Sequence, residues 1–329
     1  MKVLMIGGTG LISTAVVEEA LLRNIDVYIL NRGKKNISFS KPIHSLICDI
    51  HDEQAVHKAL ENEFFDVIID FIAFTVDHVK RDYRLFKNKT AQYIFISSAS
   101  AYQKPLPKLP ITEDIPLDNK YWEYSRNKKY CEAYLQGLND PNFNITIIRP
   151  SHTYNDQSLI FQLKSGNYPY TLIDRMINQK PIILPDQGES KWTLTYNKDF
   201  AKAFVDVLGN EKTYNDFYHL TSDKVYTWNE ITDSIYQALD VAPNIIYIPT
   251  EVILKHFPEF EGELYGDKFE SAIFDNQKIK NVAPNYVSKT EYPDIAKLAV
   301  NYYLSHKDAQ KIDDEFIIRY EKLILEYKE

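Results

Sequence analysis

Residues 3–13 of the chain read VLMIGGTGLIS. The apolar run Val3–Ile6 has the composition of a buried strand, the glycine-rich stretch Gly7–Gly10 follows it, and a helical pattern begins at Ile12. Glycine lets the backbone turn tightly and approach a pyrophosphate, whose charge the first amides of the next helix then meet. The order of strand, glycine turn and helix predicts a dinucleotide-binding βαβ unit, with a glycine-rich turn that holds no ligand as the alternative. Ser13 stands where a third glycine is common; because that position governs helix–sheet packing, we expect a looser fit and not a loss of binding.

The same alternation continues through the first 150 residues. Apolar runs that predict strands lie at Val27–Leu30, Ser45–Ile47, Val67–Asp70, Tyr93–Ser97 and Ile145–Ile148. Helical periodicity lies at Ile12–Arg23, Glu53–Glu61, Asp77–Phe86 and Trp122–Leu138. Strands that alternate with helices predict an α/β fold, here a doubly wound parallel Rossmann sheet of about seven strands that Phe217–Leu220 completes.

The second half of the chain is less regular. Asn197–Leu208 has a helical pattern, a capping box at Thr227–Glu230 opens a helix to about Leu239, and Asp294–Lys328 looks mostly helical. We expect residues 1–155 to form the dinucleotide-binding domain, completed by about 194–222. Residues 156–193 and 223–329 are expected to form a smaller mixed C-terminal substrate-binding lobe, with the active site in the cleft between the two.

The bulk composition is that of an ordinary globular protein, with 44% hydrophobic and 26% charged residues. The net charge of −8 argues against a nucleic-acid partner, which would require a basic face to neutralise phosphates. No apolar stretch approaches the length of a membrane span, and the N-terminus lacks a signal-peptide cleavage region. Cys48 and Cys131 are too few for a disulfide framework and have no metal-ligand spacing, so we expect no metal site. Taken together, these features predict a cytoplasmic location. The expected partner is a small-molecule substrate, with a homodimer as a candidate assembly.

The end of the second predicted strand bears on the choice of cofactor. A site that prefers NAD carries an acidic residue there for the ribose diol, whereas this chain has Asn31 followed by Arg32, Gly33, Lys34 and Lys35. Arg32, helped by one of the lysines, would suit a 2′-phosphate, so we expect NADP(H) in preference to NAD(H). For the lysines, a solvated basic loop is an equally good interpretation.

A tyrosine precedes a lysine by four residues at Tyr124/Lys128, and the same spacing recurs at Tyr83/Lys87 and Tyr303/Lys307. Context favours the first pair, because it begins the helix between the fifth and sixth strands and follows Ser97–Tyr102 by about two dozen residues. In this setting the chain resembles the extended short-chain dehydrogenases/reductases, the family that contains the nucleotide-sugar epimerases and dehydratases. The motifs that carry the resemblance are the glycine turn, Cys48-Asp49-Ile50, Ala73, Ser98, Tyr124/Lys128, Arg149-Pro150 and Asn197-Lys198-Asp199-Phe200-Ala201.

The resemblance implies a catalytic serine at Ser98, an acid/base at Tyr124 and its activating partner at Lys128, and it places Asp49 and Ile50 at the adenine. The physics is compatible with these roles, since a cation one helical turn away stabilises a phenolate. Ser98 as a strand-end hydroxyl bonded to backbone, and Tyr124 as a core residue, are the structural alternatives. The expected cofactor-binding residues are Gly7, Thr9, Gly10, Leu11, Ile12, Asn31, Arg32, Asp49, Ile50, Ala73, Tyr124 and Lys128.

The family pattern is incomplete in two places. Ala99 and Ser100 stand where the dehydratases of the family carry an Asp-Glu pair, so dehydration is not expected. Both arginines that clamp the substrate diphosphate in nucleotide-sugar enzymes are absent. Trp192 occupies one of the two positions, and the segment that should hold the other reads Leu264-Tyr265-Gly266-Asp267. Lys191 or Lys268 could replace them as point charges, with solvated surface as the alternative.

The sequence is compatible with two functions. The first is an NAD(P)-dependent epimerase or reductase that acts on a nucleotide sugar or a related carbohydrate-like substrate. The second is a cofactor-binding regulatory or scaffold protein with vestigial chemistry. For the substrate we expect His152 to line the pocket as a hydrogen-bonding group and Trp192 as an apolar wall, with capping of backbone groups by His152 and core packing by Trp192 as the alternatives.

Overall fold

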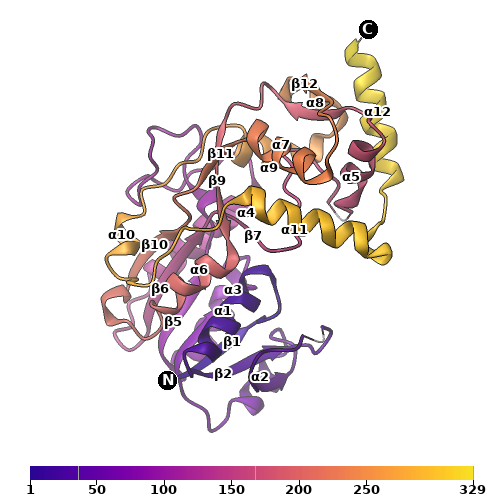
Figure 1. Ribbon diagram of the computed structural model, residues 1–329. Coiled ribbons are helices and arrows are strands. Elements are labelled where there is room, and N and C mark those ends of the chain that lie inside the picture. The colour runs from indigo at the N-terminus through magenta and orange to yellow at the C-terminus, as the bar shows by residue number, and fades with distance from the viewer. Residues whose placement is uncertain (36, 167, 329) are drawn as a thin grey trace.

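The computed structural model describes residues 1–35, 37–166 and 168–328. Its largest element is a seven-stranded sheet in the lower lobe of Figure 1. The strands are β1 (Lys2–Ile6), β2 (Asp26–Asn31), β3 (His44–Ile47), β4 (Phe65–Asp70), β5 (Thr90–Ile96), β6 (Asn144–Pro150) and β10 (Asp216–Leu220). The predicted fold class and strand number are confirmed, and every predicted strand in this sheet overlaps the observed one.

The strand order is β10-β6-β5-β4-β1-β2-β3, and every neighbouring pair is parallel. The chain builds outward from β1 to β3 and then crosses back, so that β4 pairs with β1 on its other side. In such sheets ligands bind beyond the carboxyl ends of the strands, where the strand order reverses. The glycine turn follows β1 and therefore lies at this point.

Helices cover both faces of the sheet. On one face, α1 (Leu11–Leu22) and α6 (Asn197–Val205) bury apolar residues against the central strands. On the other face lie α2 (Glu53–Ala59), α3 (Val76–Phe86) and α4 (Glu123–Gln136). The strands are apolar on both faces because both are covered, which is why their sequences read as continuous hydrophobic runs and not as alternating ones.

The upper lobe contains both helices and strands, and its sheets have fewer strands than the sheet of the lower lobe. A three-stranded sheet has the order β11-β9-β7, and β12 pairs with β8. Its strands are β7 (His152–Tyr154), β8 (Ile182–Pro185), β9 (Lys191–Tyr196), β11 (Val225–Thr227) and β12 (Ile245–Ile248). Its helices are α5 (Tyr170–Ile177), α7 (Trp228–Leu239), α8 (Thr250–His256), α9 (Glu261–Glu263), α11 (Tyr292–Ser305) and α12 (Asp314–Lys328), and a π-helical turn spans Leu264–Lys268.

The capping box that opens α7 is confirmed. The Thr227 hydroxyl accepts from the amide of Glu230, and the Glu230 carboxylate accepts from the amide of Thr227 at 2.7 Å. Together with α5, α11 and α12, this helix encloses the largest hydrophobic cluster of the molecule.

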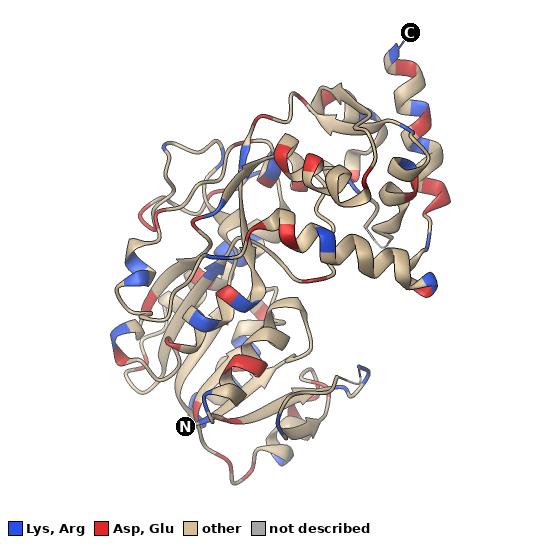
Figure 2. Cartoon of the chain, in the orientation of Figure 1, with Lys and Arg blue, Asp and Glu red and all other residues tan. Residues whose placement is uncertain are grey.

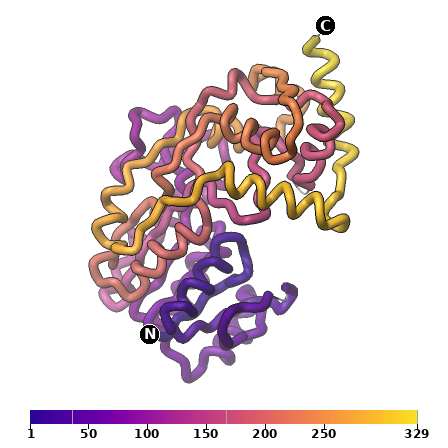
Figure 3. The backbone as a smooth tube through the Cα atoms, in the orientation of Figure 1, coloured from indigo at the N-terminus to yellow at the C-terminus, as the bar shows by residue number. Residues whose placement is uncertain are grey.

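The chain crosses between the lobes more than once (Figure 3). After β9 it returns to the lower lobe to add α6 and β10, and after the π-helical turn it returns again to place α10 (Gln277–Lys280) beside β10. Both lobes therefore consist of segments that are distant in the sequence.

Acidic and basic residues are interspersed along the helices of both lobes (Figure 2). The net charge of the chain is −8. Among the described residues, none of the helices combines the length and the apolar character needed to cross a membrane.

Candidate active site

The glycine turn after β1 has a backbone conformation that favours glycine. Gly7 and Gly8 have φ angles of 102° and 56°, which L side chains rarely adopt. A Cβ at Gly8 would also lie 2.6 Å from Ile29 Cγ2. At the third glycine position, the Ser13 hydroxyl accepts a hydrogen bond of 2.8 Å from the amide of Gly10, which ties the turn to the first turn of α1.

A cavity of about 520 Å³ opens above this turn. It is lined by Gly7, Thr9, Gly10, Ser13, Leu30, Asn31, Arg32, Lys34, Lys35, Cys48, Asp49, Ile50, His51, Phe71, Ile72, Phe74 and His78. The bare glycine backbone at one side and the basic loop at another match the pyrophosphate and the adenosine end of a nicotinamide dinucleotide, so the residues fit this cofactor.

Seven of the twelve expected cofactor residues line this cavity, and five do not: Leu11, Ile12, Ala73, Tyr124 and Lys128. Leu11 is on the surface of α1 with 38% of its area exposed, and Ile12 packs against the core beneath that helix. Ala73 is fully buried, and its carbonyl oxygen accepts a hydrogen bond from Lys128. The sequence alone does not show which residues of the turn and of α1 face away from the cavity.

Polar contacts shape the adenosine end of the cavity. The Asn31 side chain accepts a hydrogen bond of 2.7 Å from the amide of Gly33 and so holds the basic loop in its turn. The amide of His51 donates to Asp49, which lowers the pKa of that carboxyl, with Arg32 contributing in the same direction. The loop residues Arg32, Lys34 and Lys35 thus face the cofactor cavity and not only solvent.

Lys128 lies deep beneath the catalytic candidates. Its ammonium donates to the carbonyl oxygens of Ala73 and Ile96, each at 2.7 Å, and it is 2% exposed. Burial lowers the pKa of Lys128 to about 8. Its Nζ atom lies 5.7 Å from the centre of the Tyr124 ring, so the two side chains are neighbours on α4, as their spacing predicts.

Ser98 and Tyr124 line the same cavity, which adjoins the first one and has a volume of about 270 Å³. The Ser98 hydroxyl shares a hydrogen bond of 2.8 Å with Ser100, which shares another of 2.8 Å with Ser125. Burial raises the pKa of Tyr124, and interaction with the Ser98 hydroxyl opposes the rise. The phenol is therefore a proton donor at neutral pH.

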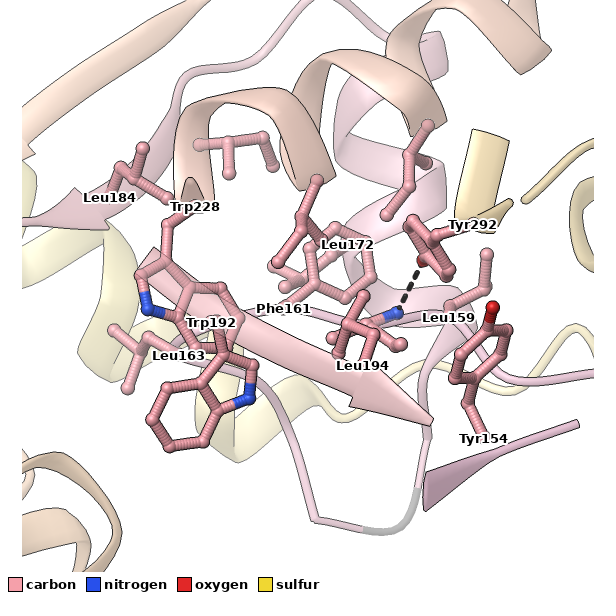
Figure 4. Packing of buried hydrophobic residues seen from close by; sticks show 14 of the residues in the cluster. Tyr154, Leu159, Phe161, Leu163, Leu172, Leu184, Trp192, Leu194, Trp228 and Tyr292 are labelled. Carbon is pink, nitrogen blue, oxygen red and sulfur yellow. Dashed lines mark hydrogen bonds between the residues drawn. The ribbon is translucent and has the colours of Figure 1, made fainter. Parts of the chain in front are cut away.

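His152 and Trp192 also line this second cavity. Burial, together with the charges of Lys164 and Lys268, lowers the pKa of His152 to about 3, so its imidazole is neutral. Trp192 is 2% exposed and packs against Trp228 with ring centres 5.4 Å apart (Figure 4). The indole is thus both a wall of the cavity and part of the hydrophobic cluster, two roles that the sequence presents as alternatives.

The structure adds lining residues that were not predicted as site residues. The second cavity also contains Ser100, Lys104, Trp122 and Asp267, and Phe74 of the first cavity lies 6.5 Å from the ring centre of Tyr124. The other two tyrosine–lysine pairs line neither of these cavities: the Tyr83 hydroxyl donates to Asp140, and the Tyr303 ring packs near Tyr170. Among the described residues, no group of three or more His, Cys, Asp or Glu side chains could hold a metal ion.

Several known proteins have related sequences. The chain matches the NAD dependent epimerase/dehydratase family over residues 3–86 and 83–220. It is 28% identical over 257 residues to the chloroplast stem-loop binding protein of 41 kDa b of Arabidopsis thaliana, a match that spans 72% of this chain and 63% of that protein. It is 21% identical over 294 residues to 2′-dehydrokanamycin reductase of Streptomyces kanamyceticus, across 87% of this chain and 80% of that protein.

Solved structures show the same fold. UDP-glucose 4-epimerase of Bifidobacterium longum, in complex with NAD⁺ and UDP, superimposes with a TM-score of 0.73 at 18% identity, across 94% of this chain and 100% of that one. The family match covers the glycine turn, the Tyr124/Lys128 helix and the last strand of the sheet. The chain belongs to the NAD-dependent epimerase/dehydratase family, which is of the extended short-chain dehydrogenase/reductase type.

Proposed function

We propose that the protein is an NAD(P)-dependent epimerase or reductase that transfers a hydride to or from a carbon atom of a nucleotide sugar or a related carbohydrate-like substrate. The observation that carries this proposal is the arrangement of the two cavities. Ser98 and Tyr124 line one cavity, the glycine turn lines the other, and Phe74 of the cofactor cavity lies beside the Tyr124 ring. A hydride donor and a proton donor would therefore reach the carbon and the oxygen of the same carbonyl group of the substrate.

A bound nicotinamide dinucleotide would supply or accept the hydride. In the direction of reduction, the Tyr124 phenol donates its proton to the carbonyl oxygen of the substrate, and the Ser98 hydroxyl donates a hydrogen bond to the same oxygen. The raised pKa of Tyr124 suits the donor role. The ammonium of Lys128 donates hydrogen bonds to two backbone carbonyls, which hold it at the bottom of the site. It lies close enough to Tyr124 to stabilise the phenolate that forms when the phenol gives up its proton.

For the cofactor we propose NADP(H) in preference to NAD(H). Arg32, Lys34 and Lys35 line the adenosine end of the cavity, and a guanidinium is suited to bind a 2′-phosphate in bidentate fashion. Titration that follows cofactor fluorescence tests this choice, and NADH binding as tightly as NADPH would refute it. Replacing Arg32 with serine should weaken NADPH binding by about tenfold, the loss expected for one charge-assisted contact, and leave NADH binding nearly unchanged.

The proposed substrate class follows the similar proteins, which include 2′-dehydrokanamycin reductase and UDP-glucose 4-epimerase. An epimerase regenerates its cofactor within one cycle, whereas a reductase exchanges it. Absorbance at 340 nm of the purified protein, before any cofactor is added, would distinguish a retained reduced cofactor from an exchanging one. Ala99 and Ser100 make dehydration an unsuitable reaction, because the acid that expels a hydroxyl in the dehydratases of the family is absent from those positions.

Replacing Tyr124 with phenylalanine tests the proposed acid/base. Turnover of NADPH with a panel of keto sugars and NDP-sugars should fall by about 10²–10⁴-fold, because the substrate oxygen loses its proton donor. Cofactor binding should stay within about twofold, since Tyr124 is not among the residues that line the cofactor cavity. Tyr83→Phe is the matched control, because Tyr83 has the same spacing to a lysine but bonds to Asp140. Activity that survives in Tyr124→Phe would refute the assignment.

A second candidate is a cofactor-binding regulatory or scaffold protein. The identity to a stem-loop binding protein favours it, as does the lack of arginine at Trp192 and Leu264. The net charge of −8 and the preserved set of Ser98, Tyr124 and Lys128 oppose it. Turnover of any sugar substrate by the wild type would exclude vestigial chemistry.

A further inference from the structure

The cavity that holds Ser98 and Tyr124 has in its wall an aromatic residue to which the proposed reaction assigns no role, Trp122. Its indole lies next to the Tyr124 phenol, with ring centres 5.1 Å apart and ring planes inclined at 48°. The chain contains three tryptophans, and the other two, Trp192 and Trp228, are 2% and 0% exposed. Trp122 is partly exposed, so a molecule in the cavity can touch its indole.

The backbone that carries Trp122 is held in place. It is extended, with φ and ψ angles of −117° and 119°, directly before the first turn of α4. The Asn119 side chain, which is 1% exposed, donates to the carbonyl oxygen of Ser100 at 2.7 Å and to that of Gly266 at 2.6 Å. The oxygen of the same side chain accepts a hydrogen bond of 3.0 Å from the amide of Tyr121. The segment is therefore tied both to the wall of the cavity and to the π-helical turn of the upper lobe.

Two glycines of the upper lobe make room for the indole. A Cβ at Gly262 would lie 2.3 Å from Trp122 Cδ1 and 2.8 Å from its Cγ, and a Cβ at Gly266 would lie 3.0 Å from the Trp122 Cβ. Gly262 belongs to α9, and Gly266 belongs to the π-helical turn that follows it. No side chain fits at Gly262 unless the indole moves, and the space at Gly266 is nearly as tight. The place of the indole thus depends on bare backbone at both positions.

An indole beside a proton donor is suited to a sugar ring. A pyranose carries its hydroxyl groups around its rim and presents C–H groups on its two faces, so that covering a face removes apolar surface from water without breaking a hydrogen bond. The face of an aromatic ring is flat and carries negative charge density, which attracts such C–H groups. Apolar side chains at Leu106, Ile111 and Phe274 line the same cavity. The cavity therefore combines apolar walls with the two hydroxyl groups of the proposed reaction.

We propose that Trp122 is the platform on which a pyranose ring of the substrate stacks. Ser98 and Tyr124 hold the reacting oxygen, and the indole fixes the plane of the ring that carries this oxygen, so the two together determine which carbon is presented to the cofactor. Gly262 and Gly266 act through Trp122 and are positioning residues. The inference rests on the proposed function and narrows its substrate to pyranoses, either free or carried by a nucleotide.

Binding to the full-length protein loaded with NADP⁺, measured by ligand-observed NMR titration, tests this without requiring turnover. The probes are D-glucose and UDP-glucose, which contain a pyranose, and D-sorbitol and UDP, which do not. Trp122→Leu should weaken the binding of the tighter pyranose probe by tenfold or more and change that of D-sorbitol and UDP by less than twofold. Trp122→Phe keeps an aromatic face and should weaken pyranose binding by less than threefold. Tyr121→Leu is the matched control, because Tyr121 packs against Tyr265 and does not line the cavity; it should change pyranose binding by less than twofold.

Tryptophan fluorescence and a double mutant give two further readouts. Because the other two tryptophans are buried, pyranose binding should change the emission of the wild type and leave that of Trp122→Phe unchanged, although this variant still binds. Gly262→Ala should weaken pyranose binding by fivefold or more, since its Cβ displaces the indole. In the Trp122→Ala background the atoms that this Cβ would meet are absent, so the same change should add less than twofold.

Several results would overturn the inference. One is pyranose binding that Trp122→Leu leaves unchanged, or that Trp122→Leu and Trp122→Phe weaken equally, because a role in packing does not require an aromatic face. Others are a wild type that binds neither pyranose, an emission that does not respond to binding, and additive effects of Gly262→Ala and Trp122→Ala. Failure of the proposed function has a different signature, because Tyr124→Phe would then retain turnover whatever the titrations show.

Discussion

Replacing Glu132 with glutamine should strongly destabilise the protein, although the two side chains are nearly the same size. Glu132 is 1% exposed, and Arg149 is 3% exposed. The guanidinium of Arg149 donates to the Glu132 carboxylate from Nε at 3.0 Å and from Nη2 at 2.7 Å. The Ser97 hydroxyl donates to the same carboxylate. This network joins α4 to the ends of β5 and β6, directly beneath Ser98.

The magnitude follows from the burial of both charges. Removing one partner of a buried ion pair costs about 3–5 kcal/mol, because the remaining charge is left uncompensated in a medium of low dielectric constant. Glutamine has nearly the shape of glutamate, so the loss would come from the charge and not from a cavity. For a protein whose free energy of unfolding is about 5–15 kcal/mol, such a loss is a large fraction of the total.

Urea unfolding followed by circular dichroism measures the change. Glu53→Gln is the matched control, because Glu53 pairs with Arg84 on the surface, and the pair is 37% and 56% exposed. That control should cost no more than about 1 kcal/mol. The combined variant Glu132→Leu with Arg149→Met removes both buried charges and should lose less than Glu132→Gln alone. A Glu132→Gln variant as stable as Glu53→Gln would refute the reasoning.

Three further predictions follow from single side chains. Gly8→Ala should cost about 1–3 kcal/mol of unfolding free energy and weaken cofactor binding, since Gly8 has a φ angle of 56° and no room for a Cβ. Urea unfolding and cofactor fluorescence measure the two effects. Gly166→Ala is the control and should change neither, because a Cβ at Gly166 would meet nothing within 4 Å. Burial lowers the pKa of Lys128 from 10.5 to about 8, so the charged side chain opposes folding by about 3 kcal/mol below pH 8 and by less as the pH rises toward 10.5. The wild type should therefore gain stability relative to Lys128→Met between pH 8 and 10.5. A difference in stability that does not depend on pH would contradict this assignment. Trp192→Arg should lower the urea midpoint strongly because it places a charge in the hydrophobic cluster; a variant of wild-type stability would show that Trp192 is not a core residue.

Local sequence patterns were sufficient to predict the seven-stranded sheet, although they predicted no strand of the two smaller sheets. The apolar runs before Gly7 and at 67–70, 93–97 and 145–148 predict parallel strands because both faces of this sheet are covered, and the structure places all of them in it. The capping box at Thr227 predicts the start of α7 because its two hydrogen bonds depend on residues only three apart. The family resemblance rests on motifs at the carboxyl ends of these strands and is confirmed.

The patterns were less informative about which residues of a motif face a ligand. Leu11, Ile12 and Ala73 belong to the cofactor motifs, yet their side chains lie on a surface or in a core. Trp192 shows a different limit, since an indole is large enough to line a cavity with one edge and pack against Trp228 with its face.

The sequence by itself determined the doubly wound sheet, the position of the glycine turn and the neighbourhood of Tyr124 and Lys128, because each depends on periodicity or spacing within a short segment. Only the tertiary structure decided what surrounds Tyr124. Lys104 enters the cavity from the segment after β5, and Asp267 enters it from the π-helical turn of the upper lobe. The segment that contains Asp267 aligns with a family motif, but the sequence could not show that Asp267 and Lys104 meet in one cavity, since the meeting of segments so far apart in the chain depends on how the two lobes pack.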